Sequence, residues 1–299
     1  MAFGTTVRDW PGGPLLCCAC CLWCACLTTT RASAIRSDTP PGADIRRTFK
    51  DEGVLFMVTQ FDTPQEPTGF VRPVKMVVVS ARPESLKIDV NRTAIIVVDM
   101  QNAFVSKGGM FDVFGFDISG ARSVIDNNKK LIDAARTAGA KIVFLMMSYD
   151  LNYADSGGPE SPNWHKELGL VMMRKNPASW GKYVTKGSWD EEICSELTPQ
   201  SGDIVIRKSR YSGFHATNLD TILKGYNIKY CVYTGVATNV CVESTLRHGY
   251  FLDYWPILVT DAVNNAGPSA TQEGTFWNVE TMFGWLATTE DLVEAFSGQ

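Results

Sequence analysis

Three side chains capable of acid–base or nucleophilic chemistry follow buried, strand-like runs of this sequence. Asp99 ends one apolar, β-branched run, and Lys208 ends another. Cys241 lies seven residues beyond Thr234, which ends a third run. A thiol, a carboxylate and an ammonium are complementary, because they can serve as nucleophile, base and stabilising cation. These residue types therefore predict covalent catalysis by a cysteine, provided that the fold brings the three together.

Each of the three also has a structural interpretation. An aspartate after a strand usually caps a turn, a lone lysine is usually a solvated surface charge, and a free cysteine is usually a small buried hydrophobe. The functional interpretation gains weight because all three follow strands, at the edge where open α/β sheets bind ligands. Spacing alone leaves both interpretations open.

The sequence around Cys241 favours a reactive thiol. A thiol in the first turn of a helix lies near the positive end of the helix dipole, and a neighbouring ammonium lowers its pKa below the free value of about 8.5. Thr238 or Asn239 would cap that helix. Gly235 allows a sharp turn that points backbone N–H groups into the site, and such groups can form an oxyanion hole.

Alternating strands and helices must position these residues. Apolar runs predict strands at 94–98, 141–147, 203–207, 229–234 and 257–260, and helical spacing predicts helices at 124–135, 219–223, 240–250 and 271–283. Gly139 suits the position that follows a helix C-terminus. Such alternation indicates a parallel sheet covered by helices on both faces. Right-handed crossovers make an open doubly wound, Rossmann-like α/β sheet the simplest topology.

The first 80 residues differ from the remainder. Residues 1–43 contain six of the nine cysteines, all within Leu15–Leu27, and predict a disordered leader or a targeting segment. A signal peptide, a transit peptide and a lipidated cluster are alternatives. Residues 44–80 predict an N-terminal extension, and residues 81–299 a single catalytic domain. Leu15–Leu27 is shorter than the ~20 residues that span a bilayer, so no transmembrane helix is expected.

Composition narrows the classes of function. Hydrophobic residues make up 45% and charged residues 20%, which is typical of a soluble globular protein. The net charge of −4, without a basic face, argues against a nucleic-acid partner. Three histidines without ligand spacing predict neither a metal nor another cofactor. The few cysteines of the body predict a reduced, cytoplasmic protein, with organellar or secretory targeting by residues 1–43 as the alternative.

Longer motifs surround the candidate residues. The stretch VVDMQNAF at 97–104 resembles the first-strand motif of the isochorismatase-like cysteine hydrolases, and GVATNVCVEST at 235–245 resembles their nucleophile motif. The stretches at 157–166, 186–190, 210–214 and 278–285 are similar to one subgroup, the ureidoacrylate amidohydrolases of pyrimidine breakdown. The likeness runs from about residue 81 to residue 296, which makes 81–299 an expected isochorismatase-like hydrolase domain.

This resemblance implies a role for individual residues. Cys241 matches the family nucleophile, Asp99 the acid/base aspartate and Lys208 the catalytic lysine. A cis peptide is implied at Val236–Ala237, and the backbone N–H groups of Ala237 and Cys241 would form the oxyanion hole. The implied reaction cleaves the carbamoyl (ureido) group of ureidoacrylate or peroxyureidoacrylate, giving an aminoacrylate and carbamate through a thioenzyme intermediate.

Substrate contacts are predicted less sharply. Asn102, Phe104, Tyr149 and Tyr211 lie near strand ends, where they could contact the substrate. Ordinary packing around the mouth of the site is at least as good an interpretation of Phe104 and Tyr149.

Other functions stay open at this point. Nicotinamidases of this fold carry an Asp-x-His metal motif after the second strand, whereas residues 148–152 read SYDLN without a histidine. The same chemistry on biuret or an N-carbamoyl amino acid is the nearest alternative. A non-catalytic interaction module is a more distant one, against which the presence of all three candidate residues argues. Similar hydrolases are commonly oligomeric, so a homo-oligomer is expected.

Overall fold

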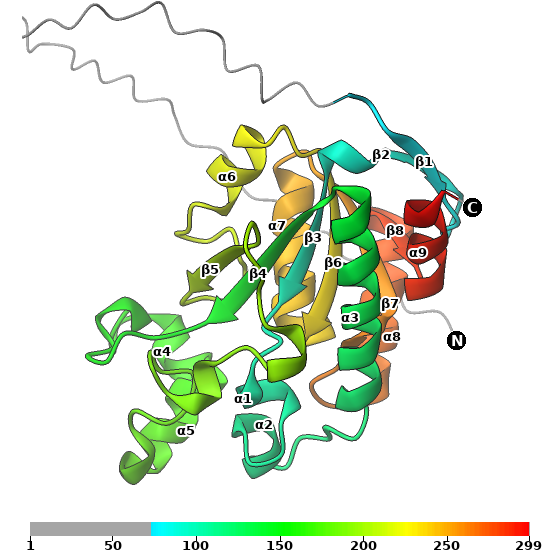
Figure 1. Cartoon of the computed structure of the whole chain (residues 1–299). Coiled ribbons are helices and arrows are strands. Elements are labelled where there is room, and N and C mark those ends of the chain that lie inside the picture. The colour runs from blue at the N-terminus through cyan, green and yellow to red at the C-terminus, as the bar shows by residue number, and fades with distance from the viewer. Residues whose placement is uncertain (1–72, 299) are drawn as a thin grey trace, which may run out of the picture. The chain divides into compact units, whose positions relative to one another are not determined.

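The computed structural model of this protein describes residues 73–298 (Figure 1). The predicted leader at 1–43, and the extension up to residue 72, lie outside the described residues. Between residues 73 and 298 the structure contains no helix that is both long enough and apolar enough to cross a membrane.

Six parallel strands form the central sheet in the order β5-β4-β3-β6-β7-β8. They are β3 (Thr93–Val98), β4 (Lys141–Met147), β5 (Ile204–Lys208), β6 (Tyr230–Val236), β7 (Trp255–Asn264) and β8 (Trp285–Ala287). Every residue of β3 and β6 is buried, which explains why these strands are continuous apolar runs in the sequence. The prediction of an open doubly wound parallel sheet is confirmed.

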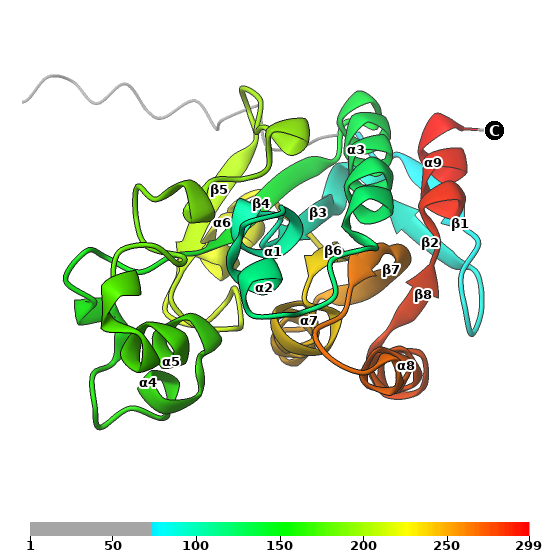
Figure 2. The same ribbon diagram turned by 90° about the horizontal axis from the view of Figure 1, so that it is seen from below.

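Helices cover both faces of the sheet. Figure 2 shows α3 (Ala121–Ala138) and α9 (Thr289–Ser297) on one face, with α7 (Glu243–Phe251) and α8 (Ser269–Asn278) on the other. Side chains of β3 alternate between the two: Ile95 and Val97 belong to one apolar cluster, and Ile96 and Val98 to the other. The second cluster also contains residues of α6 (Leu219–Gly225). This alternation fixes which side chains of each strand can reach the helices.

Several shorter elements surround this sheet and its covering helices. They comprise the antiparallel pair β1 (Met76–Val79) and β2 (Leu86–Asp89), the short helices α1 (Asn102–Val105), α2 (Met110–Val113), α4 (Pro162–Lys166) and α5 (Leu168–Lys175), and π-helical turns at Thr238–Val242 and Val279–Phe283. Helices α4 and α5 lie beyond the carboxyl end of β4 (Figure 1).

The structure differs from the predicted elements in specific places. The predicted helices at 240–250 and 271–283 each divide into a π-helical turn and an α-helix. Strand β7 extends to Asn264, beyond its predicted end at residue 260. Its pairing with β6 shifts register between Tyr233 and Gly235 and resumes at Val263 and Asn264. Helix α9 was missed, although Thr288 and Asp291 form the reciprocal hydrogen bonds of a capping box.

Asp190 is a buried carboxyl that ties two segments together. Its Oδ1 accepts the N–H of Met110 at 3.1 Å, and its Oδ2 accepts the N–H of Val184 at 3.1 Å. Burial raises the pKa of Asp190 from 3.8 to about 6, against the opposing effect of these hydrogen bonds. The folded protein therefore holds this proton over a pH range in which the unfolded chain has lost it.

We expect the contribution of Asp190 to the free energy of unfolding to decrease as the pH rises. Because the folded state binds the extra proton between pH 3.8 and about 6, the contribution of Asp190 is fully present below that window and is lost across it. Asp190→Asn cannot ionise, so the unfolding free energy of the wild type should decline relative to that of the variant over this window. Urea titrations at pH 4, 5, 6 and 7 measure the difference. A difference that does not change with pH would contradict this assignment.

Candidate active site

The topology brings Asp99 and Cys241 to one edge of the sheet. Strands β3 and β6 are neighbours at its centre, where the order of connection reverses: β4 and β5 extend to one side, and β7 and β8 to the other (Figure 1). Asp99 follows the last residue of β3, and Cys241 lies in the turn after β6. Open α/β sheets bind ligands at such a reversal point, outside the carboxyl ends of the strands.

Lys208 reaches Asp99 from β5, two strands away. Its Nζ donates to Oδ2 of Asp99 at 2.7 Å, and both side chains are fully buried. The ammonium also donates to the carbonyl of Arg210 at 3.3 Å and lies 3.7 Å from Sδ of Met147 at the end of β4. Oδ1 of Asp99 is buried and accepts no hydrogen bond of ordinary geometry from residues 73–298. A buried ion pair thus lies at the predicted position, and the Cys241 thiol is close enough to hydrogen-bond to its carboxylate.

The backbone at Asp99 turns sharply. Its φ of 49° lies in the left-handed region, which side-chain-bearing residues adopt infrequently. The N–H of Asp99 donates to the carbonyl of Leu145 at 2.9 Å, and its own carbonyl accepts the N–H of Gln101 at 2.7 Å. Gln101 in turn joins the end of β4, because its amide exchanges hydrogen bonds with the backbone of Met147 at 2.8 and 2.9 Å. These contacts fix the carboxylate against the neighbouring strand.

Cys241 lies in the π-helical turn between β6 and α7 and is 6% exposed. Its carbonyl accepts the hydroxyl of Thr245 at 2.6 Å, which joins the turn to α7. The peptide bond between Val236 and Ala237 is cis, as the resemblance implied. The side chain of Cys241 is close enough to hydrogen-bond to both Asp99 and Lys208, so the structure brings the three residues together.

The predicted cap of this helix is wrong. Ala237 precedes the turn, and neither Thr238 nor Asn239 accepts a capping hydrogen bond from it. Asn239 instead fastens the turn to the loop after β7: its Nδ2 donates to the carbonyl of Ala266 at 2.9 Å, and its Oδ1 accepts the N–H of Ala266 at 3.1 Å. A π-helical turn shifts the side chains relative to an α-helix, so the capping pattern no longer applies.

The predicted low pKa of the thiol is also wrong. Burial raises the pKa of Cys241 well above its usual value, and the Asp99 carboxylate raises it further against the opposing charge of Lys208. Burial likewise raises the pKa of Asp99, although Lys208 lowers it. Burial lowers the pKa of Lys208, but the charges of Asp99 and Cys241 outweigh it, so that pKa is raised. These shifts favour a protonated thiol at Cys241 and a charged ammonium at Lys208.

Two of the four predicted substrate contacts are occupied by the protein itself. In α1, the Nδ2 of Asn102 donates to the carbonyl of Trp189 at 2.9 Å, while its Oδ1 accepts the hydroxyl of Ser106 at 2.9 Å. Phe104 is buried edge-to-face against Phe111, with ring centroids 5.0 Å apart. These contacts hold both side chains in place beside the site, and their contact with substrate stays a prediction.

The other two predicted substrate contacts are the tyrosines Tyr149 and Tyr211. Tyr149 is fully buried, and its hydroxyl accepts Nδ2 of Asn163 at 3.0 Å and donates to the carbonyl of Ser209 at 3.3 Å. Tyr211 is half-buried and donates to the carbonyl of Lys166 at 3.3 Å. Of the two, Tyr211 lines a cavity.

That cavity has a volume of about 480 Å³ and adjoins the segments that carry Lys208 and Cys241. Its walls come from the start of α4 and α5, the loop after β5 and the first turns of α7: Ser161, Pro162, Asn163, Lys166, Glu167, Arg210, Tyr211, Ser212, His215, Ser244 and His248. Sequence reasoning did not single out Glu167 or Arg210. Arg210 belongs to the stretch 210–214, and the resemblance of this stretch to the ureidoacrylate amidohydrolases could have indicated its place near the site.

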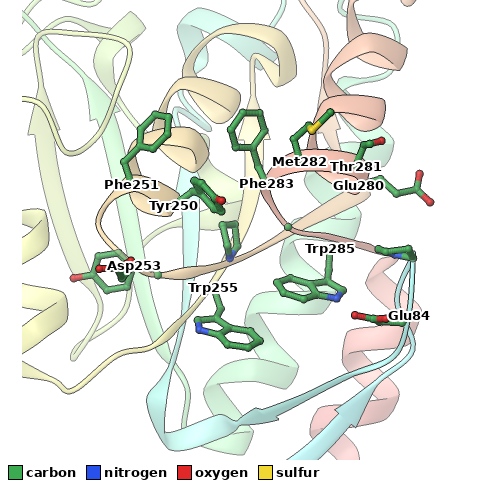
Figure 3. A pocket seen from close by; sticks show the side chains of 14 residues that line it. Glu84, Tyr250, Phe251, Asp253, Trp255, Glu280, Thr281, Met282, Phe283 and Trp285 are labelled. Atoms are coloured by element: carbon green, nitrogen blue, oxygen red, sulfur yellow. The ribbon is translucent and has the colours of Figure 1, made fainter.

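A larger cavity, about 640 Å³, lies at the opposite end of the sheet (Figure 3). Trp255 and Trp285 begin β7 and β8 and stack there with centroids 5.3 Å apart. The other aromatic residues of the wall are Tyr250, Phe251, Tyr254 and Phe283. None of the three candidate catalytic residues lines either cavity, but the walls of the smaller one include Arg210, two residues after Lys208, and Ser244, three residues after Cys241. The smaller cavity is therefore the candidate substrate site.

Gly235 fixes the start of the turn that carries Cys241. Its φ is +104°, and a Cβ atom built on it would lie 2.0 Å from the carbonyl oxygen of Val98 on the paired strand β3. We expect Gly235→Ala to lower the unfolding free energy by at least ~2 kcal/mol and to reduce activity, because strain and a backbone clash combine. Gly225→Ala, whose added Cβ would meet nothing within 4 Å, is the matched control. Equal urea midpoints for the two variants would contradict this role.

Comparison with known proteins places the site in context. Residues 93–291 match the family model of the isochorismatase domain. The ureidoacrylate amidohydrolase RutB of Klebsiella pneumoniae is 50% identical over 222 residues, covering 74% of this chain and 94% of that protein. RutB of Variovorax paradoxus is 50% identical over 220 residues, covering 74% and 87%.

Solved structures agree with this relationship. A cysteine hydrolase from Pseudomonas syringae pv. phaseolicola is 26% identical with a TM-score of 0.61, covering 76% of this chain and 98% of that one. The N-carbamoylsarcosine amidase of Thermoplasma acidophilum is 25% identical with a TM-score of 0.50, covering 67% and 97%. The resemblance drawn from residues 97–104 and 235–245 is confirmed, and the chain belongs to the isochorismatase-domain family.

Proposed function

We propose that this protein is an amidohydrolase that removes the carbamoyl group from ureidoacrylate or peroxyureidoacrylate. The observation that carries the proposal is the 50% identity to RutB ureidoacrylate amidohydrolase over 222 residues. The buried Asp99–Lys208 pair beside Cys241 supplies groups suited to that chemistry.

In the first step Asp99 acts as the base. Its Oδ1, which accepts no hydrogen bond of ordinary geometry from the described residues, takes the proton of the Cys241 thiol. The raised pKa of Asp99 makes the carboxylate a stronger base than an exposed aspartate. The thiolate attacks the carbamoyl carbon, while Lys208 keeps its hydrogen bond to Oδ2 and balances the buried negative charge.

The remaining steps return the proton. The backbone N–H groups of Ala237 and Cys241 would stabilise the tetrahedral oxyanion. Asp99 then protonates the nitrogen that carries the acrylate, and the C–N bond breaks to release aminoacrylate and leave a carbamoyl-thioenzyme. Water, deprotonated by Asp99, attacks this carbamoyl carbon, and the C–S bond breaks. Carbamate leaves, and the proton returns to the Cys241 thiol.

A second candidate is an N-carbamoyl amino acid. The structural similarity to N-carbamoylsarcosine amidase favours it, because the same nucleophile and base would act on the same ureido group. The two substrates share the ureido group and differ in the acid attached to it, for which Tyr211 and Arg210 of the 480 Å³ cavity are the candidate contacts. Tyr149 does not line this cavity, but its hydroxyl accepts a hydrogen bond from Asn163, which does.

Product release tests the proposal. Ammonia and carbon dioxide are measured from ureidoacrylate, biuret and N-carbamoylsarcosine, with wild type and Cys241→Ala side by side. We expect turnover of ureidoacrylate that is lost in the variant. If only another ureido compound were turned over, that compound would be the substrate instead of ureidoacrylate. Turnover by Cys241→Ala would contradict the mechanism with a cysteine nucleophile.

We further infer that the protein is a cytoplasmic homo-oligomer. The three described cysteines are free thiols, which suits a reducing compartment. Phe251, Trp255 and Met282 are exposed around the larger cavity, a cluster of apolar side chains that monomers seldom leave uncovered. Sedimentation velocity of the full chain measures the assembly, and a monomer at micromolar concentration would contradict it.

A further inference from the structure

We propose that Glu167 forms a subsite that binds the N–H groups of a ureido substrate in the cavity beside Cys241. This inference rests on the proposed function and deepens it, because it assigns the residue that distinguishes a ureido group from a simple carboxamide. Glu167 lines the 480 Å³ cavity together with Asn163, Arg210 and Tyr211.

The burial of Glu167 is unusual for a carboxylate. Only 3% of the residue is exposed, and no ion pair among residues 73–298 includes it. Buried carboxylates are ordinarily paired with a cation or carry several hydrogen bonds, because removing the charge from water is costly. A negatively charged side chain in a cavity wall therefore needs an explanation.

Helix capping accounts for part of its environment. Glu167 precedes α5, where its Oε1 accepts the N–H of Gly169 at 3.1 Å and its Oε2 accepts the N–H of Leu170 at 2.9 Å. Serine, threonine, asparagine and aspartate are the preferred capping residues, and the first three would do this without burying a charge. A carboxylate has about four acceptor positions. Two backbone hydrogen bonds leave two acceptor positions, and the Tyr149 hydroxyl is close enough to hydrogen-bond there and lower the pKa of Glu167. A substrate N–H would replace that hydroxyl, which has the carbonyl of Ser209 as its other acceptor at 3.3 Å.

The charges around Glu167 place it in the same electrostatic environment as the candidate catalytic residues. Burial raises the pKa of Glu167, and the ammonium of Lys208 is among the groups that lower it. Burial is the largest cause of the raised pKa of Tyr211. The charges of Glu167 and then of Cys241 raise that pKa further. The carboxylate and the thiol therefore act on the same phenol, at the wall of one cavity.

The ureido group suits this carboxylate. Each of its two nitrogens bears an N–H that points away from the carbonyl oxygen, and the two bonds run roughly parallel. A carboxylate accepts such a pair with its two oxygens, as it accepts the parallel N–H groups of arginine. A simple carboxamide has only one nitrogen and cannot make the second bond. Glu167 would therefore select the ureido group and turn its carbonyl oxygen away from α5.

Two substitutions separate this role from capping. Glu167→Gln keeps the length of the side chain without the charge, and Glu167→Ser keeps a capping oxygen at the start of α5. Glu160→Gln removes an exposed carboxylate from the same region and serves as the control. Urea unfolding of each variant reports whether α5 remains in place.

The readout is a comparison of two ligands. One is ureidoacrylate as substrate; the other is glutaconic acid monoamide, in which a CH₂ group replaces the internal N–H, as competitive inhibitor. We expect both Glu167 variants to raise KM for ureidoacrylate by about 10- to 100-fold, as for loss of hydrogen bonds to a charged group. The inhibition constant of the monoamide should stay within about 3-fold, and Glu160→Gln should change neither.

Other results would overturn the subsite. Equal changes in KM and in the inhibition constant would indicate general damage to the cavity, and no change in either would leave capping as the sole role. The proposed function fails separately, if the wild type does not turn over ureidoacrylate. In that event the ureido compound that it does turn over, paired with its own CH₂ analogue, tests Glu167 in the same way.

Discussion

Replacing Cys241 with serine is expected to lower turnover on the order of 10⁴-fold or more, with little change in fold. Loss of the nucleophile removes the covalent path, and in enzymes whose catalytic groups act as a unit such a loss costs about as much as losing all of them. Serine is nearly isosteric, so the turn between β6 and α7 keeps its packing. Its hydroxyl is far less acidic than a thiol, and Asp99 cannot ionise it to a useful extent. Steady-state product release measures the loss, and circular dichroism checks the fold.

The other free cysteines of the described region provide a matched control. Burial raises the pKa of Cys194 to about 11 and that of Cys231 to about 12, and neither Asp99 nor Lys208 is among the groups that shift these pKa values. Cys194→Ser and Cys231→Ser should therefore retain activity, even where the buried hydroxyl lowers stability. A Cys241→Ser enzyme with more than about a hundredth of wild-type turnover would contradict the nucleophile assignment, given such losses elsewhere. Equal losses in all three variants would do the same.

Lys208→Met is expected to have the second largest effect, on stability as well as on activity. The substitution leaves Asp99 buried without its 2.7 Å partner, and breaking a buried ion pair costs about 3–5 kcal/mol. The lone carboxylate would take up a proton, so it could no longer serve as a base at neutral pH. Urea unfolding and product release measure the two losses.

A double substitution separates charge from shape. Asp99→Asn together with Lys208→Met removes both charges, so most of the lost stability should return, whereas activity should stay absent. Lys129 and Asp133 form an exposed pair at 2.9 Å on α3, and Lys129→Met should change stability by less than ~1 kcal/mol. If the double variant were as unstable as Lys208→Met alone, the ion pair would not be the source of the loss.

The sheet could be predicted because its strands are buried on both faces. β3 and β6 contain no solvent-facing positions, so each reads as one unbroken apolar run with a recognisable end. The carboxyl ends of such strands share one edge, which is why the sequence alone predicts that Asp99 and Cys241 lie close together. Their catalytic roles stay predictions, to be tested as above.

The remainder depended on tertiary contacts that sequence patterns do not encode. Nothing in the residues around Glu167 indicates that its side chain turns inward, because α4 and α5 are short and lack a long apolar repeat. Similarly, the sequence does not indicate that Asn102 hydrogen-bonds to Trp189 and Ser106. The sequence predicts a lowered pKa for Cys241, whereas burial, which is a property of the folded protein, raises it.

The most direct test of the Cys241 mechanism is mass spectrometry of the rapidly quenched enzyme. Wild type is mixed with ureidoacrylate, quenched in acid during turnover and digested. The account predicts a peptide that contains Cys241 and carries the added mass of one carbamoyl group, absent from Cys241→Ser and from unreacted enzyme. Full turnover without any adduct on Cys241, or with the adduct on another residue, would contradict it.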